Sequence, residues 1–484
     1  MRPASIASRS PRMLWDLSSL IFGQFLSMAL GFVGFAYLTR TLSAESYGFV
    51  EYAVAIAAIA AVVVEGGMGA IGTLYVSRDR SRAPELAARI PMARLLLAMA
   101  VIPLVGLVGT VTTTDPAVRT LIWLFGFSLL SVPLKQDWLL QGLERMTYVA
   151  PAQALKSALF AILVMFAVRS PGDIFAVGAA EATAAVMGGL YFLGAQRTLS
   201  IPIAIDRRLT GAWELIRTGA SVGAANMLWP FMVYAPVLLV ANLAGSVEAA
   251  WLGAAQRIVI ALVSVSGLYF FNMYPLIART LRDDPAVWGR LMASSYRLIA
   301  WIGIGAALAI TLFAPVLVTA IFGPDYRVSA PVLATAIWIL PIRLLSGHAR
   351  WSLLAAERQA TLLRVELACA ATIVAGGVLL IPAYGALGGA IAAVTGNFIG
   401  WVLAHLGAHR HMDPLPGVRP ALPPTAIALV AGAVGIAAGP SILVSLGALL
   451  AYSGCLWAAA PELLSDAVRL AYARNSPAVQ DQQG

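Results

Sequence analysis

The amino-acid sequence predicts an all-α polytopic membrane protein with about 14 transmembrane helices. Hydrophobic residues make up 60% of the 484 positions and charged residues only 11%, and the mean hydropathy is +0.84. Soluble domains carry about 25% charged residues, so this composition excludes an ordinary soluble protein. Apolar segments of about 20 residues, long enough to cross a bilayer as a helix, recur along the whole chain.

A hydropathy window of about 19 residues separates these segments. The first is too long for the apolar core of a signal peptide and lacks a small-residue cleavage site, so we interpret it as a span. Only Gly439-Pro440 separates the last two, which can also form one broken or re-entrant segment. The predicted spans are 14–38, 47–73, 91–112, 118–138, 148–168, 174–195, 214–242, 249–277, 295–321, 329–353, 361–382, 386–407, 421–439 and 441–459.

Positive charge is distributed unevenly between the connections. With the N-terminus in the cytoplasm, 24 Lys and Arg residues fall on the cytoplasmic side and only Arg40, Arg119, Arg169 and Arg327 on the other. This asymmetry follows the positive-inside rule and predicts that both termini are cytoplasmic. It also accounts for the net charge of +9. Because the basic residues are spread over short loops that face lipid headgroups, we expect no nucleic-acid partner.

The connections are too short to form folded domains, so function is expected among the helices. The segment IDRRLTG, at 205–211, precedes the seventh span and is the natural hinge between two halves. We therefore predict an N-terminal six-helix lobe at 14–200 and a C-terminal six-helix lobe at 210–408 around a central cavity, as in transporters. An extra two-helix hairpin at 421–459 and a cytoplasmic tail at 461–484 complete the chain.

Four stretches together resemble one protein family. FAYLTRTLSAESYGFVEYAVAIAAIAAVVVEGGMGAIGTLYVSRDR resembles its opening signature, and AAWLGAAQRIVIALVSVSGLYFFNMYPLIAR resembles its eighth span. AIFGPDYRVSAPVLATAIWIL and PAYGALGGAIAAVTGNFIG resemble its later outer turns. In this order and spacing, over about residues 14–408, the chain resembles the polysaccharide flippases of the Wzx type in the MOP exporter superfamily.

The resemblance implies a transporter of the bacterial cytoplasmic (inner) membrane. Its substrate would be a polyprenyl-diphosphate-linked oligosaccharide repeat unit, flipped between leaflets by alternating access and coupled to H⁺ or Na⁺. It implies membrane lipids and the polysaccharide polymerase machinery as partners, and no cofactor. Lipid II flippases of the MurJ type and MATE drug exporters share the superfamily and remain alternatives.

Moving such a substrate requires a cationic place for the diphosphate. The planar guanidinium of Arg binds phosphate oxygens in pairs and stays charged when buried. A cation inside a span costs at least about 2.5–3.5 kcal/mol and should face protein or water. The substrate-binding candidates inside spans are Arg257, Arg343, Arg350, Lys156 and Asn272. Two alternatives stay open: Arg350 can extend to the cytoplasmic headgroups, and Lys156 can form a structural ion pair with Glu181.

Ion coupling usually relies on a carboxylate within the membrane. The coupling or gate candidates are Glu65, Glu181, Glu51 and Glu366. Glu65 lies beside Gly66-Gly67, where it can act in coupling or in a gate salt bridge, whereas Glu366 can pair with a nearby basic residue. Pro230 is the candidate gating hinge, because proline bends a membrane helix.

An integral-membrane polysaccharide polymerase is the less favoured reading. Such enzymes carry a large outer loop, and the sequence contains no HExxH or GxxxxGK[ST] pattern. Cys369 and Cys455 have no CxxC or His partner, and the four histidines do not form a metal set. We therefore predict that the chain is not an enzyme and binds no metal.

Overall fold

The computed structural model describes residues 10–204, 206, 209–412, 417–437 and 442–475. These ranges form α-helices and short 3-10 segments and contain no strand. The chain divides into two compact units, Met1–Ala250 and Trp251–Gly484. The predicted lobes at 14–200 and 210–408 are functional halves, and they stay a prediction.

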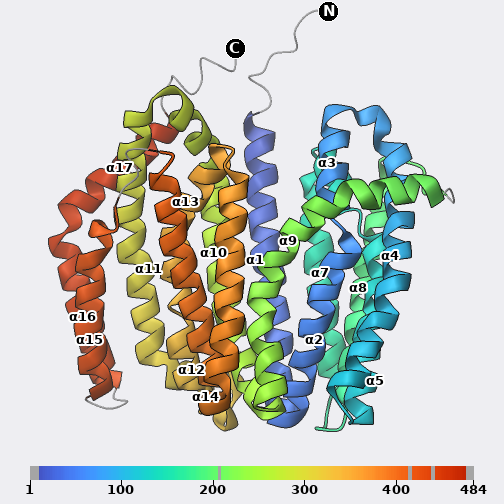
Figure 1. Ribbon diagram of the computed structural model, residues 1–484, viewed down its shortest axis with the longest axis horizontal. Coiled ribbons are helices and arrows are strands. Elements are labelled where there is room, and N and C mark those ends of the chain that lie inside the picture. Colours follow the sequence, from blue (N-terminus) through green and yellow to red (C-terminus); the bar gives the residue numbers. More distant parts are fainter. Residues whose placement is uncertain (1–9, 205, 207–208, 413–416, 438–441, 476–484) are drawn as a thin grey trace, which may run out of the picture. The chain divides into compact units, whose positions relative to one another are not determined.

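The first unit is a bundle of long helices, several of which are broken (Figure 1). Helix α7 packs between α1 and α8, and α2 packs against α9. A 3-10 segment, η3 (Ser128–Leu134), separates α5 from α6, so the predicted span 118–138 is not one continuous helix. The helices are α1 (Ser10–Thr41), α2 (Ala44–Glu65), α3 (Met68–Arg78), α4 (Ala83–Thr112), α5 (Pro116–Phe127), α6 (Asp137–Gly142), α7 (Val149–Ala167), α8 (Ile174–Thr198) and α9 (Leu209–Leu243).

The predicted span 47–73 is broken between α2 and α3. Gly66 and Gly67 have φ values of 59° and 70°, a conformation that costs glycine little and other residues more. A Cβ on Gly67 would lie 2.5 Å from the backbone O of Gly219 and 2.5 Å from the backbone N of Gly223. Glycine at position 67 therefore permits both the break and the close approach of α9.

The second unit begins within α10 (Ser246–Asp283) and also contains broken spans. Asp284 caps the start of α11, where its carboxylate accepts hydrogen bonds from the backbone N of Ala286 and Val287. The predicted span 329–353 is divided into α12 and α13. The remaining helices are α11 (Pro285–Phe322), α12 (Ser329–Ala336), α13 (Ile339–Ala355), α14 (Gln359–His409), α15 (Leu422–Ala437), α16 (Ile442–Ala458) and α17 (Ala460–Asn475).

Helix α14 reverses direction in its middle. Gly385 has non-helical angles, φ 52° and ψ −130°. A Cβ on Gly396 would lie 2.4 Å from the side chain of Ile373, so the two arms run back along each other. These arms correspond to the predicted spans 361–382 and 386–407.

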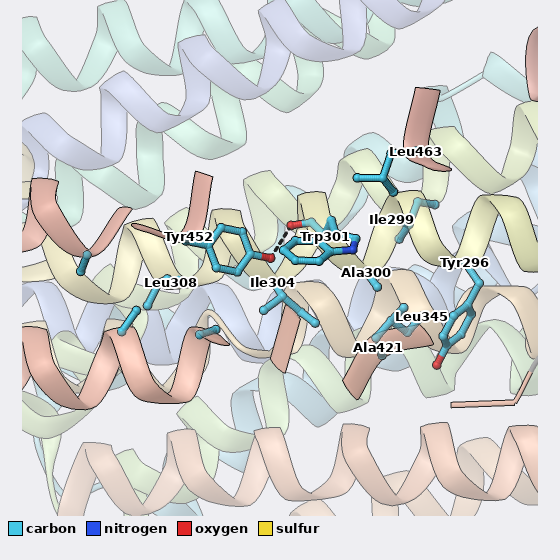
Figure 2. Packing of buried hydrophobic residues seen from close by; sticks show 13 residues of the cluster. Tyr296, Ile299, Ala300, Trp301, Ile304, Leu308, Leu345, Ala421, Tyr452 and Leu463 are labelled. Atoms are coloured by element: carbon cyan, nitrogen blue, oxygen red, sulfur yellow. Dashed lines mark hydrogen bonds between the residues drawn. The ribbon is translucent and has the colours of Figure 1, made fainter. Parts of the chain in front are cut away.

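Helices α15, α16 and α17 pack against α11 (Figure 1). Figure 2 shows the cluster between them, in which the hydroxyl of Tyr452 donates to the backbone O of Trp301 at 2.8 Å. The carboxylate of Asp466, on α17, is fully buried and accepts two hydrogen bonds from Arg297, at 2.8 and 3.0 Å. The predicted tail 461–484 thus begins as a docked helix, and its residues 476–484 lie outside the described residues.

Ten helices or broken helices in the described ranges are long and apolar enough to cross a membrane. Counting the bent pair of α16 and the start of α17 as one span gives up to eleven. This number is lower than the predicted fourteen because of how the helices are joined and how long they are. The two arms of α14 count once, α15 and α16 have only 16 and 17 residues, and α1 is not among the ten.

Candidate functional site

Lys156 and Glu181 form an ion pair inside the first unit. Nζ of Lys156 on α7 lies 2.7 Å from Oε1 of Glu181 on α8. Tyr234 of α9 lies close enough for its hydroxyl to interact electrostatically with this ammonium group. The Lys156 side chain is 44% exposed although it lies seven residues, about 10 Å, inside α7. The expected ion pair is present, and it borders an accessible surface.

Polar side chains continue along the contact between α1 and α7. The hydroxyls of Ser27 and Ser157 are 2.8 Å apart, and Ser27 also donates to the backbone O of Gln153 at 3.2 Å. Ser157 follows Lys156 directly in α7, so these groups and the ion pair occupy neighbouring turns. This part of the first unit therefore offers hydrogen-bonding groups in the middle of otherwise apolar helices.

Glu65 pairs with Arg94, which lies near the start of the predicted span 91–112 and was not among the candidate site residues. Nη2 of Arg94 donates to Oε1 of Glu65 at 3.1 Å, and Nη1 donates to the backbone O of Lys135 at 2.7 Å. Glu65 also accepts hydrogen bonds from the backbone N of Gly67 and Gly69. The Arg94 side chain is only 1% exposed. The pair therefore fixes the breaks in two predicted spans, 47–73 and 118–138. Because α4 begins at Ala83, eight residues before the predicted start, Arg94 lies further inside its helix than the sequence indicated.

Arg350 and Glu366 form a buried ion pair between α13 and the first arm of α14. The side chains are 8% and 18% exposed, with Nη1 of Arg350 against Oε1 of Glu366. A Cβ on Gly400, in the second arm of α14, would lie 2.8 Å from Nη2 of Arg350. Glu366 thus has the basic partner that was expected. Arg350 is enclosed by protein and does not extend to the headgroups, and its role in substrate binding stays a prediction.

The other predicted site residues are distributed over both units. Arg343 and Arg257 are half-buried, on α13 and α10. Asn272 is exposed and donates to the backbone O of Leu268 at 2.8 Å, within its own helix. Glu51 is buried and accepts a hydrogen bond from the hydroxyl of Tyr47. Pro230 lies inside α9, which continues through it from Leu209 to Leu243.

A family model described as "Polysaccharide biosynthesis protein" matches residues 14–281, which is more than half of the chain. The chain belongs to this family. Membership confirms the resemblance to Wzx-type flippases that the sequence motifs indicated. The family contains transporters and is not an enzyme family, in agreement with the expectation that this chain is not an enzyme.

Similar proteins agree with this assignment. A putative O-antigen transporter of Shigella dysenteriae is 22% identical over 375 residues, which cover 74% of this chain and 90% of the relative. A structure of the lipid II flippase MurJ in an inward closed conformation matches with a TM-score of 0.69 and 10% identity, over 90% of this chain and 98% of MurJ. An inward-facing MATE multidrug transporter of the MOP superfamily matches with a TM-score of 0.63 and 15% identity, over 82% and 97%. At these identities the structural matches show the fold.

The comparisons and the helices together establish a multi-pass membrane transporter of polysaccharide biosynthesis with the MOP fold. No group of three or more His, Cys, Asp or Glu residues suited to a metal ion occurs within the described ranges. Of the polar groups inside its helices, the Lys156–Glu181 pair combines a charge with an accessible surface.

Proposed function

We propose that this protein flips polyprenyl-diphosphate-linked oligosaccharide repeat units from the inner to the outer leaflet of the bacterial cytoplasmic membrane. The Shigella relative, of which this chain covers 90%, is named an O-antigen transporter, and a solved structure with the same fold is named a lipid II flippase. Both names describe lipid-linked saccharides. We further propose alternating access of two six-helix lobes, fourteen crossings, cytoplasmic termini and the polymerase machinery as partner.

The observation that carries this proposal is the partly exposed side chain of Lys156, whose ammonium group is paired with Glu181. A lysine near the middle of a spanning helix is costly in lipid, so an exposed one indicates a water-lined surface. An ammonium group there matches the diphosphate that links the polyprenyl chain to the sugar. Glu181 holds Lys156 in the absence of substrate, and the diphosphate would replace that carboxylate.

The remaining candidate residues have binding, structural, coupling or hinge roles in this proposal. Arg257 and Arg343, both half-buried in the second unit, remain candidates for binding the substrate through their guanidinium groups, and Asn272 remains a candidate through its amide. Arg350 contributes through its ion pair with Glu366, which holds α13 against α14. Glu51, Glu65 and Glu181 remain coupling or gate candidates, and Pro230 remains the proposed hinge.

The direct experiment locates the substrate when the protein is removed. In a deletion strain of the native host, undecaprenyl-linked repeat units should accumulate on the inner leaflet, and the parent gene should restore surface polysaccharide. Lys156→Gln should not restore it although the protein reaches the membrane, whereas Arg282→Gln, at an exposed cation paired with Asp283, should. We expect Arg257→Ala or Arg343→Ala also to abolish surface polysaccharide.

Two results would redirect the assignment. Repeat units that accumulate on the outer leaflet would indicate a polymerase. Cell lysis with lipid II retained on the inner leaflet would indicate a lipid II flippase, the second candidate, which the match to MurJ over 98% of its length favours. Normal polysaccharide in the deletion strain would contradict the proposal outright.

A further inference from the structure

A hydrogen-bonded chain of three side chains crosses the core of the second unit. The hydroxyl of Tyr269 on α10 lies 2.6 Å from Oγ of Ser295 on α11, and this Oγ lies 2.7 Å from Nε2 of His348 on α13. His348 is fully buried, Ser295 is 1% exposed, and Tyr269 is half-buried. The chain therefore connects a partly accessible hydroxyl to an enclosed imidazole.

The hydrogen bonds assign the protons along this chain. Nδ1 of His348 lies 3.3 Å from the backbone O of Leu345, which can only accept, so Nδ1 carries a proton. In the neutral imidazole Nε2 then accepts from Ser295, and Ser295 accepts from Tyr269. The two bonds between the side chains run in one direction, toward His348, which is the arrangement that proton transfer along the chain requires.

Aromatic rings and a second histidine surround His348. The ring of Phe270 on α10 lies 5.0 Å from its ring, and that of Tyr296 on α11 lies 5.2 Å away, both edge-on. From α14, His405 packs on the other side of Tyr296, 5.8 Å from that ring. These rings exclude water from the imidazole.

Charged or titratable groups also lie on α13 and α14, and His405 of α14 interacts electrostatically with His348. Arg350 and Arg343 are on α13 itself, and the charge of Arg350 is matched by Glu366 of α14. From α10 and α11 the titratable groups that face His348 are the hydroxyls of Tyr269 and Tyr296. Among the described contacts of this imidazole there is no carboxylate, so a proton bound there would add an uncompensated charge to the core.

Three of the four coupling carboxylates predicted from the sequence are held in ion pairs, and the fourth, Glu51, accepts a hydrogen bond from Tyr47. Glu65 pairs with Arg94, Glu181 with Lys156, and Glu366 with Arg350. A carboxylate held by a cation resists protonation, because the proton would leave the cation without its partner. Histidine, by contrast, ordinarily changes its charge near neutral pH.

We propose that His348 is the proton-binding site that couples transport to a proton gradient, with Tyr269 and Ser295 as its relay. This inference rests on the proposed function. In the transfer step Ser295 gives its proton to Nε2, Tyr269 gives its proton to Ser295, and a hydronium ion from the acidic solution gives a proton to the Tyr269 oxygen and leaves as water. The imidazolium then donates from both nitrogens, to Leu345 and to Ser295.

Protonation would change which conformation is favoured. A buried imidazolium without a carboxylate partner is costly, so the protonated protein favours an arrangement in which water reaches His348. The neutral form favours the closed packing seen here, because its two nitrogens are both hydrogen-bonded. A proton taken up on one side and released on the other would thereby drive the transport cycle.

The test uses purified full-length protein in vesicles that contain a fluorescent, short-chain polyprenyl-diphosphate-linked N-acetylglucosamine. With a gradient of one pH unit, the parent should accumulate this probe in the leaflet on the acidic side, by up to about tenfold per coupled proton. His348→Gln should leave the probe evenly distributed, while its rate of equilibration persists. Tyr269→Phe should slow the gradient response without changing the final distribution, and His409→Gln, at an exposed rim histidine, should behave like the parent.

The outcomes separate this inference from the proposed function. A parent that equilibrates the probe but ignores the gradient overturns the proton site and keeps the flippase. A full gradient response in His348→Gln also overturns the proton site. If His348→Gln does not fold, the rate of the gradient response in Tyr269→Phe decides: a slower response supports the site and an unchanged one overturns it. If the parent moves no probe, the proposed function fails. The site is then judged by NMR of labelled histidines: a signal that titrates as the pH is lowered and is lost in His348→Gln supports it, and no such signal overturns it.

Discussion

Removing the carboxylate of Glu366 tests how strongly the second unit depends on its buried ion pair. Glu366→Gln keeps the size of the side chain but leaves the Arg350 guanidinium, 8% exposed, without its counter-charge. Breaking a buried pair by removing one partner costs about 3–5 kcal/mol. For a unit of this size that corresponds to a melting temperature lower by roughly 10 °C.

The assay is intrinsic tryptophan fluorescence of the detergent-purified protein during heating. Replacing both partners, as Arg350→Met with Glu366→Leu, should recover most of the loss, because no buried charge remains. Arg282→Gln removes one partner of an exposed pair and should melt with the parent. If Glu366→Gln melted within about 2 °C of the parent, water would have to reach Arg350 and the buried pair would not hold α13 to α14.

Four further predictions follow from individual contacts. Gly67→Ala, whose Cβ would lie 2.5 Å from α9 backbone atoms at a φ of 70°, should lower the melting temperature by several degrees, whereas Gly194→Ala, with open space around it, should not. Arg94→Met should destabilise the break between α2 and α3, seen as faster proteolysis at the α3–α4 connection, and unchanged proteolysis would contradict the role of the Glu65 pair. Tyr452→Phe should cost about 1 kcal/mol, through loss of its bond to Trp301, and an unchanged melting temperature would show that this bond contributes nothing. Hydrogen bonds from the backbone N of Arg169 and from Ser170 lower the pKa of Asp173. The stabilising contribution of this carboxylate is therefore present at neutral pH and lost as the pH falls through the lowered pKa. The difference in melting temperature between the parent and Asp173→Asn should shrink below about pH 4, and a constant difference would contradict this prediction.

The sequence predicted the helical membrane architecture because hydropathy and loop charge depend on local composition. It also offered the ion pair of Lys156 with Glu181 as one of two alternatives and favoured a basic partner for Glu366, because charges inside spans must be compensated. It missed Arg94, since the start of α4 at Ala83 depends on packing that hydropathy does not record. The chain from Tyr269 to His348 was also missed, because it joins three helices that are distant in sequence.

The breaks inside spans were beyond the sequence for a related reason. Gly66-Gly67 is a visible signal, but the break is fixed by the approach of α9 and by the carboxylate of Glu65. The turn at Gly385, in contrast, could be expected, because the pattern already separated two spans at that point. Local signals thus located turns between spans, and contacts between helices decided the breaks within them.

The central claim is that the accessible cation of α7 recognises the diphosphate of a lipid-linked saccharide. The most direct measurement is the rate at which the fluorescent polyprenyl-diphosphate probe crosses vesicle bilayers that contain the purified protein. The parent should exceed empty vesicles clearly, Lys156→Arg should retain most of that rate, and Lys156→Gln should lose about 10–100-fold, the value of a charge-assisted hydrogen bond. A parent no faster than empty vesicles, or a Lys156→Gln variant as fast as the parent, would contradict it.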